Sequence, residues 1–215
     1  CELGAVFYRS GRRDEAVRVW QELATQRPAE PLAQHARRHA GRVARPEAAS
    51  AKRQRLAAFP SVAQLRDHCG PAAVELYLRF FGVPAEQLEI ARAIKLPTGG
   101  TPVYKMRRFL EAAGFATRRI EADLAQLRVL LDAGIPVILE EDYSQSRHVA
   151  VAIGYDDAQE TLAVQDPMSH EVRETPYEQL ARLRSLANNG ALVAVPRADE
   201  SRLAAIGAVE CRYIT

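Results

Sequence analysis

The sequence predicts a protein of the α+β class, with helices in its N-terminal half and an antiparallel sheet in its C-terminal half. Apolar residues recur at helical spacing through most of residues 3–45 and 69–113. From about residue 115 the period shortens, and short apolar runs alternate with turn residues. With 215 residues, 47% of them hydrophobic, the chain is long enough for one full domain and a smaller one.

The first 45 residues predict a helical hairpin followed by a third helix over PLAQHARRHAGRVA. Small and apolar residues flank the turn sequence RSGRRD at helical spacing: Leu3, Gly4, Phe7, Ala16, Trp20 and Leu23, before Pro28. This order resembles the tetratricopeptide repeat, in which small residues let paired helices approach closely. The resemblance implies a repeat-like segment over 1–45 that offers a surface to a protein partner. An amphipathic hairpin without repeat ancestry is the alternative.

The remaining chain is predicted to form a linker at 46–60, a main domain at 61–197 and a tail at 198–215 that starts a further helix. Ala, Pro and charged residues mark the linker. Helices are predicted in the main domain at about 70–81, 85–94, 102–113 and 124–134. Strands are predicted at 116–122, 136–142, 148–156, 161–167 and 191–196. The acidic residues 140–142, which end a strand, are expected to be solvated.

Composition argues against several classes of partner and cofactor. The formal charge is only +2, with both signs interleaved, so no nucleic-acid partner is predicted. No run approaches the ~18 apolar residues of a membrane span. The three cysteines are far apart, and His35 and His39 have no third ligand nearby, so no metal, cofactor or disulfide framework is expected. Free thiols slightly favour the cytoplasm over the cell envelope. Because the chain begins with Cys, we expect a fragment of a longer protein.

One cysteine stands where its chemistry would be enhanced, in the stretch QLRDHCGPAAVELYLRFFG at 64–82. Cys69 directly precedes Gly70 and Pro71, which suit the first turn of a helix. The free amides and dipole of a helix N-terminus lower a thiol pKa and favour the nucleophilic thiolate. The position therefore indicates a candidate catalytic cysteine, with an inert structural cysteine as the alternative. The neighbouring His68 is expected to be a rim residue.

A histidine and an aspartate complete the pattern. His148 begins the strand HVAVAIGYD and Asp166 ends the strand TLAVQD, with the turn DAQE midway between them. A hairpin would place them side by side, so that the carboxylate orients the imidazole while its other nitrogen faces the sulfur. Gln64, together with the backbone amide of Cys69, could form an oxyanion hole.

The segments QLRDHCGPAA, SRHVAVAIGYD and LAVQDP, in this order, resemble the C39-like cysteine peptidases of bacteria, a branch of the papain-like fold. The resemblance covers about residues 60–197. It implies that Cys69 is the nucleophile, His148 the base, Asp166 the orienting group and Gln64 the oxyanion donor, acting on a peptide or protein substrate. The predicted substrate-contacting residues are Gly70, Gly99, Gly100, Thr101 and Arg147.

The best-known members of that family are joined to ABC transporters and cut leader peptides after Gly-Gly. This sequence has no Walker motif, so leader processing coupled to export is not expected. Two functions remain open: a cysteine peptidase, and a C39-like domain with little turnover that acts with the helices as a peptide-binding scaffold. The residues do not distinguish hydrolysis from acyl transfer to an amine.

Overall fold

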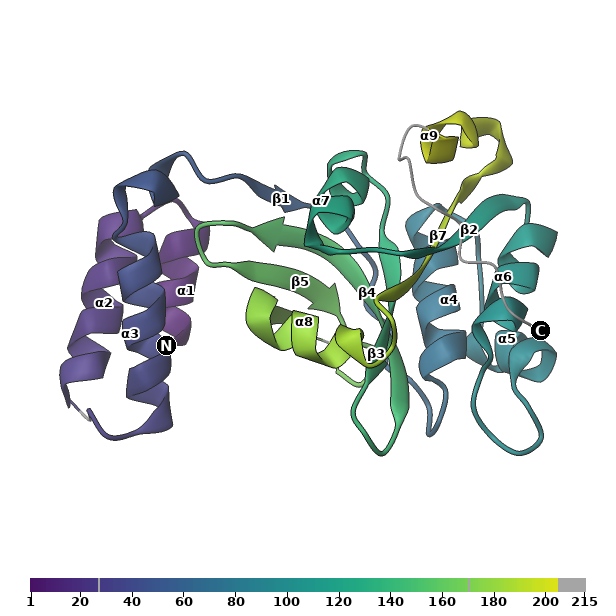
Figure 1. Ribbon diagram of the computed structural model, residues 1–215, viewed down its shortest axis with the longest axis horizontal. Coiled ribbons are helices and arrows are strands. Elements are labelled where there is room, and N and C mark those ends of the chain that lie inside the picture. The colour runs from purple at the N-terminus through teal and green to yellow at the C-terminus, as the bar shows by residue number, and fades with distance from the viewer. Residues whose placement is uncertain (27, 170, 205–215) are drawn as a thin grey trace. The chain divides into compact units, whose positions relative to one another are not determined.

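The computed structural model describes residues 1–26, 28–169 and 171–204 (Figure 1). The chain divides into two compact units. One comprises Cys1–Arg53 together with Asp156–Glu160, and the other comprises Gln54–Tyr155 together with the residues from Thr161 onward. Each unit has its own hydrophobic core.

The first unit is helical, as predicted. It contains α1 (Glu2–Arg9), α2 (Arg13–Gln26), α3 (Pro31–Val43) and the 3₁₀ turn η1 (Pro46–Ala49). Its core is built from Trp20 and small residues, including Ala16, Ala24, Ala36 and Ala40. At Gly4 the backbone of α1 lies so close to Trp20 that a Cβ atom would fall 2.3 Å from the indole nitrogen. The small residues thus permit close helix packing, while the repeat ancestry of the segment stays a prediction.

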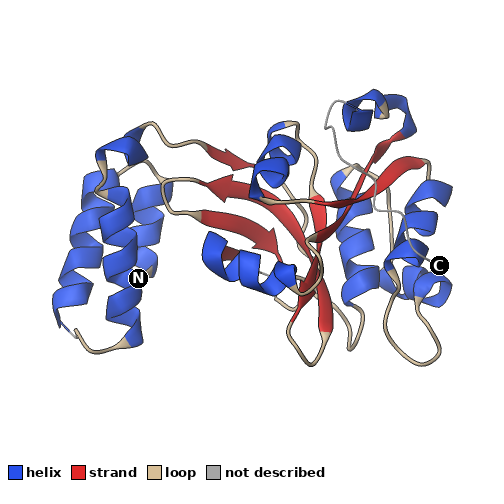
Figure 2. Ribbon diagram, in the orientation of Figure 1, coloured by secondary structure: helices blue, strands red, loops and turns tan. Residues whose placement is uncertain are grey.

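The second unit combines helices with an antiparallel sheet (Figure 2). Its helices are α4 (Cys69–Phe80), α5 (Gln87–Ile94), α6 (Val103–Ala112), α7 (Leu124–Asp132), α8 (Tyr177–Ser185), the 3₁₀ turn η2 (Arg197–Asp199) and α9 (Ser201–Ala204). Its strands are β1 (Arg53–Arg55), β2 (Phe115–Glu121), β3 (Val137–Asp142), β4 (Arg147–Asp156), β5 (Thr161–Gln165), β6 (Val172–Pro176) and β7 (Gly190–Pro196). The strand order is β2-β7-β3-β4-β5-β6, and β1 pairs with β4.

Helix α4 is fixed against the sheet through a buried tyrosine. Tyr77 is fully buried, and its hydroxyl lies 2.9 Å from the Pro136 carbonyl and 2.7 Å from the Ala194 carbonyl. The same oxygen accepts a hydrogen bond from the Ala194 N–H at 2.9 Å. A buried hydroxyl that lost these partners would cost about 1–3 kcal/mol. Helix α4, which begins at Cys69, is therefore held at a defined position on the sheet.

The predicted α+β class and antiparallel sheet are confirmed, and the predicted helices and strands lie within a few residues of the observed ones. Three elements were not predicted. Strand β1 lies inside the predicted linker 46–60, and β6 and α8 follow Asp166. Strands β1 (RQR) and β6 (VRETP) are rich in charged residues. Edge positions of a sheet tolerate polar side chains and need no apolar alternation. Gly154 of β4 lets β1 approach, since a Cβ there would lie 2.3 Å from the Gln54 carbonyl oxygen.

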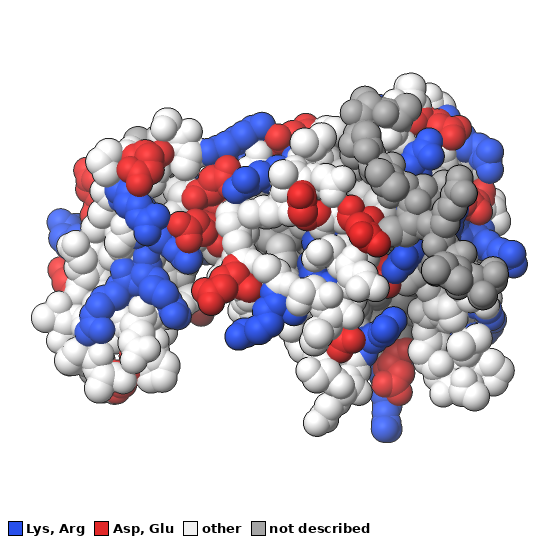
Figure 3. Space-filling model, in the orientation of Figure 1, with Lys and Arg blue, Asp and Glu red and all other residues white. Residues whose placement is uncertain are grey.

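The predicted division at 45, 60 and 197 stays a prediction. In the predicted tail, η2 and α9 form helical turns, and residues 205–215, including Cys211, lie outside the described residues. Among the residues that the structure describes, no helix combines the length and apolar character needed to cross a membrane. On the face shown in Figure 3, acidic and basic side chains are interleaved.

Candidate functional site

Cys69 is the first residue of α4. The chain enters the helix through a tight turn, in which the His68 N–H donates to the Leu65 carbonyl at 3.0 Å. Asp67 adopts the left-handed backbone conformation there, with a φ of 57°, which aspartate tolerates better than most residues. Pro71 lies in the first turn of the helix, where its missing N–H costs no hydrogen bond. The thiol is thus presented at a helix N-terminus, half-buried.

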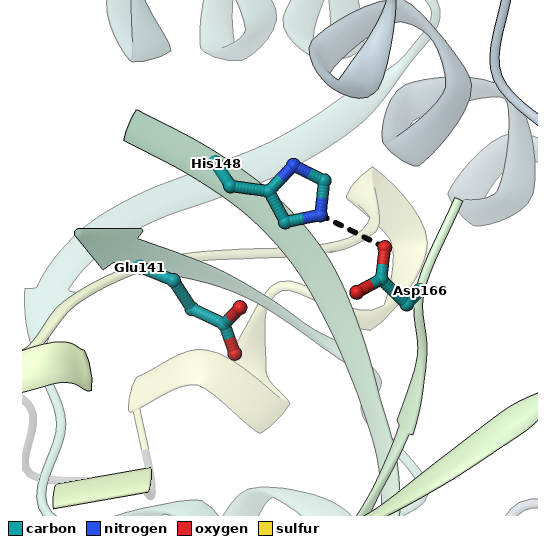
Figure 4. Close-up of side chains that lie close together, drawn as sticks. All are labelled: Glu141, His148 and Asp166. Carbon is teal, nitrogen blue, oxygen red and sulfur yellow. Dashed lines mark hydrogen bonds and ion pairs between the residues drawn. The ribbon is translucent and has the colours of Figure 1, made fainter. Parts of the chain in front are cut away.

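His148 lies near the start of β4, directly opposite Glu141 of β3 in the antiparallel register. The side chain is buried, with 7% of the residue exposed. Its Nε2–H donates to Oδ1 of Asp166 at 2.8 Å, and Figure 4 shows the imidazole edge facing that carboxylate. The bond fixes the tautomer and leaves Nδ1 as the nitrogen available to a second partner.

Asp166 directly follows β5, so the two strands of the β4–β5 hairpin carry the two partners. Its Oδ1 also accepts the Met168 N–H at 2.9 Å, and its carbonyl accepts the Ser169 N–H at 3.0 Å. Pro167 therefore lies in a turn that is stabilised by the hydrogen bonds to Asp166. These bonds hold the carboxylate toward His148 independently of any ligand.

The thiol of Cys69 is influenced by His148 and by the start of its own helix. The His148 side chain and the backbone N–H groups of Gly70 and Val149 all favour the ionised form of the thiol. Burial opposes ionisation of the thiol, but these groups outweigh it, and the pKa of Cys69 lies below its usual value. Burial likewise opposes the imidazolium, but hydrogen bonds with Asp166 and Cys69 raise the pKa of His148 to about 9. The arrangement thus shifts Cys69 toward the thiolate and His148 toward the imidazolium.

Asp166 is held in its charged form. Burial would raise the pKa of its carboxyl group, but the hydrogen bonds from His148 and from the Met168 N–H outweigh burial and lower it. Two positive charges, those of His148 and Arg173, act in the same direction. An ionised carboxylate is the form that accepts the imidazole N–H.

Gln64 is tethered beside this turn, because its backbone N–H donates to the Pro167 carbonyl at 2.7 Å. Its side-chain oxygen Oε1 is buried and has no hydrogen-bond partner among the residues described. The amide is therefore close to the loop that carries Asp166, and its N–H₂ end is the chemically suitable donor for an oxyanion. Its role as that donor stays a prediction.

The predicted substrate-contacting residues lie in different environments. Gly70 is buried, and a Cβ there would fall 2.6 Å from the Thr101 Cβ. Gly99 and Gly100 are exposed in the loop before α6, with φ values of 93° and 76° that favour glycine. Arg147 extends outward, with 78% of its side chain exposed, 3.9 Å from a carboxylate oxygen of Asp142. Only these placements are established, and substrate contact stays a prediction for all five.

The packing of Thr101 on Gly70 yields a stability prediction. Gly70→Ala is expected to lower the free energy of unfolding by about 1–3 kcal/mol, because the new methyl group overlaps Thr101. In a double-mutant cycle measured by urea unfolding, Thr101→Gly should restore part of the loss, with a coupling of about 1 kcal/mol. Additive effects of the two changes would contradict the contact.

Three further side chains of the site were not predicted from the sequence, those of Glu141, Tyr143 and Arg173. Glu141 was expected to be solvated, and this is wrong, since its side chain is fully buried. Its carboxylate accepts hydrogen bonds from Arg173 at 2.8 Å and from the Tyr143 hydroxyl at 2.8 Å. The period of two along β3 could have revealed it, because Glu141 shares a face with the buried Leu139. Arg173 gave no comparable signal, since it lies in the unpredicted strand β6.

Among the described residues, three side chains of this site are spaced closely enough to hold a metal ion. The ligand atoms of Glu141, His148 and Asp166 all lie within 4.8 Å of one another. The Arg173 guanidinium already binds Glu141 and lies 3.6 Å from Asp166, so a positive charge from the chain itself stands between the carboxylates. The donors are thus engaged with one another, and the expectation that no metal is used stays a prediction.

Comparison with solved structures shows a fold shared over about two thirds of the chain. A C39-like protein of Bacillus anthracis superposes with a TM-score of 0.56 at 15% identity, covering 67% of this chain and 98% of the other. The peptidase domain of Streptococcus ComA, a bifunctional ABC transporter, gives a TM-score of 0.53 at 22% identity, covering 64% and 98%. A double glycine motif protease from an AMS/PCAT transporter, solved with its leader peptide, gives 0.54 at 14% identity, covering 66% and 98%.

Sequence comparison finds one curated relative and one family model. An uncharacterized protein of Methanothermobacter marburgensis is 29% identical over 105 residues, which are 49% of this chain and 68% of the relative. A model of the Peptidase_C39 like family matches residues 56–184, more than half of the chain, and this match includes Cys69, His148 and Asp166. The chain therefore belongs to the Peptidase_C39 like family.

Proposed function

We propose that the chain is a cysteine peptidase that cleaves peptide bonds with Cys69 as nucleophile, His148 as general base and acid, and Asp166 as the orienting group. The observation that carries the proposal is the 2.8 Å hydrogen bond between His148 and Asp166, together with Cys69 at the N-terminus of α4, where His148 lowers the pKa of its thiol. Nucleophile, base and orienting group within hydrogen-bond reach form the arrangement that acyl transfer requires.

In the proposed reaction the Cys69 thiolate attacks the carbonyl carbon of the scissile bond, and the carbonyl oxygen becomes an oxyanion. The Cys69 backbone N–H and the Gln64 side-chain amide donate to this oxygen. The His148 imidazolium then gives its proton to the amine as the carbon–nitrogen bond breaks. Water, deprotonated by His148, hydrolyses the thioester and regenerates the thiol.

We propose a peptide or protein as the substrate. The support is the fold shared with a protease that was solved with its leader peptide bound. The N-terminal helices are proposed as a tetratricopeptide-like segment that holds a protein partner or the substrate. The close approach of Gly4 to Trp20 supports this assignment, because small residues at helix crossings are part of the repeat pattern.

The first test is digestion of a proteome-derived peptide library in water enriched in oxygen-18, read by mass spectrometry. A hydrolase should produce new C-termini that carry the heavy isotope, whereas acyl transfer to an amine should join peptides without it. The alternative, a binding module with little turnover, predicts neither product. Absence of products, together with a Cys69 that iodoacetamide alkylates no faster than Cys1 near pH 6, would overturn the peptidase proposal.

The pH dependence of cleavage gives a second prediction. The value of kcat/KM should rise on the acid side as Cys69 loses its proton, at a pH below the usual value for a thiol. It should fall again near pH 9, because His148 loses the proton that the leaving amine needs. Progress curves with one identified peptide between about pH 5 and pH 11 measure both limbs. A rate that keeps rising through pH 9 would indicate a neutral histidine instead.

A further inference from the structure

Arg173 is connected to the site through the carboxylates of Glu141 and Asp166. Its Nη2 lies 2.8 Å and 3.0 Å from the two carboxylate oxygens of Glu141. Its Nη1 donates to the Tyr143 hydroxyl at 2.9 Å and lies 3.6 Å from Oδ2 of Asp166. The Tyr143 hydroxyl in turn donates to Oε2 of Glu141 at 2.8 Å. Arg173 therefore cannot move without breaking a closed network.

The two oxygens of Asp166 have separate partners. Oδ1 accepts the N–H groups of His148 and Met168, and Oδ2 faces Arg173. This division fixes the rotation of the carboxylate about its own axis. A change at Arg173 would thus act on His148 through Asp166, with no direct contact to the thiol.

Charge gives the network a second consequence. Glu141 and Asp166 are both buried, and their ligand atoms lie within 4.8 Å of each other. Two like charges at this distance favour protonation of one of them. Arg173 compensates the pair, and the guanidinium of Arg184 on α8, 2% exposed, adds a weaker positive influence on Glu141. Among the described residues, His148 is the other titratable group that binds Asp166, and Cys69 acts on His148 in turn.

We propose that Arg173 is a positioning residue for the reaction: anchored by Glu141 and Tyr143, it keeps the Asp166 carboxylate ionised and directed at His148. The inference rests on the proposed function, but its effect is measurable on the thiol without any substrate. Arg173 lies on the edge strand β6, so its replacement leaves the hydrophobic core intact.

The test is the pH dependence of Cys69 alkylation by iodoacetamide, followed by mass spectrometry of the Cys69 peptide. In the pH profile of the alkylation rate, Arg173→Met should shift the acid limb to higher pH by about one unit. Near pH 6 this shift lowers the alkylation rate about tenfold. Arg173→Lys keeps the charge and should recover most of this loss. Arg55→Met is the matched control, because Arg55 pairs with Glu174 of the same strand and has no described contact with Asp166. Thermal unfolding of each variant reports folding.

The double variant Arg173→Met/Glu141→Gln distinguishes two roles of Arg173: compensation of the charges of Glu141 and Asp166, and structural support of the site. Removing both charges leaves Asp166 without a repelling neighbour, so the acid limb should return toward its wild-type position. A merely structural Arg173 predicts that the double variant alkylates more slowly than the single one. That outcome, or a wild-type profile for Arg173→Met, overturns the inference. If the wild type alkylates as expected but cuts no peptide, the peptidase proposal fails while the positioning role is still measured.

Discussion

Replacing Cys69 by alanine is expected to abolish cleavage of every peptide that the wild type cuts, with a loss of at least about 10⁴-fold in kcat. The reason is that the covalent step has no other nucleophile: His148 and Asp166 remain, but the sulfur is gone. Cys69→Ser should be almost as impaired, because a hydroxyl is far harder to ionise than a thiol in the same surroundings.

The loss is measured with a peptide identified from the library, by quantifying substrate and products over hours. Cys1→Ala is the matched control, since Cys1 is the other free cysteine among the described residues and belongs to the helical unit. It should cleave at the wild-type rate. Residual activity of Cys69→Ala above about one hundredth of the wild type would show that another group carries the reaction.

Replacing His148 by alanine is expected to have the second largest effect, and to act on two observables at once. Cleavage should fall by about 10⁴-fold, since both proton transfers lose their carrier. The thiol itself should also change: without the imidazole, burial is no longer outweighed, and the pKa of Cys69 should rise. Alkylation near pH 6 should therefore slow sharply and recover only at alkaline pH.

Two comparisons sharpen this prediction. His68→Ala removes the neighbouring histidine, whose ring contacts the Arg66 carbonyl and Lys95, and should leave cleavage within a few-fold of wild type. The double variant Cys69→Ala/His148→Ala should be no slower than either single variant, because residues that act as a unit lose their effect together. Additive losses would mean that the two side chains contribute through separate steps.

Much of this site was predictable because its signals are local. Cys69 precedes a helix that Gly70 and Pro71 mark in the sequence, and the hairpin between His148 and Asp166 is defined by a turn midway between them. Periodicity thus predicts which elements these residues terminate, and the antiparallel pairing then follows. Cys69 and His148 are about eighty residues apart in the sequence, and no local pattern predicts their proximity, which was expected from the chemistry of a thiol and its base and from the family resemblance.

The supporting network was not predictable by the same means. Arg173 lies in VRETP, where charged residues alternate without an apolar face, so the segment resembles a loop. Glu141 sits in an acidic run whose usual place is the surface, and only its partner Arg173 explains its burial. Single-sequence patterns identify residues by what surrounds them in the chain. A buried ion pair between two strands is defined by what surrounds it in space.

The contacts of the Cys69 sulfur have a consequence for folding. The groups that lower its pKa include His148 and Val149 on β4, which lie about eighty residues away in the sequence. The thiol of the unfolded chain would then have an ordinary pKa, and we expect its reactivity at low pH only when α4 has docked on the sheet. Alkylation of Cys69 near pH 6 is therefore expected to report whether α4 is docked on the sheet.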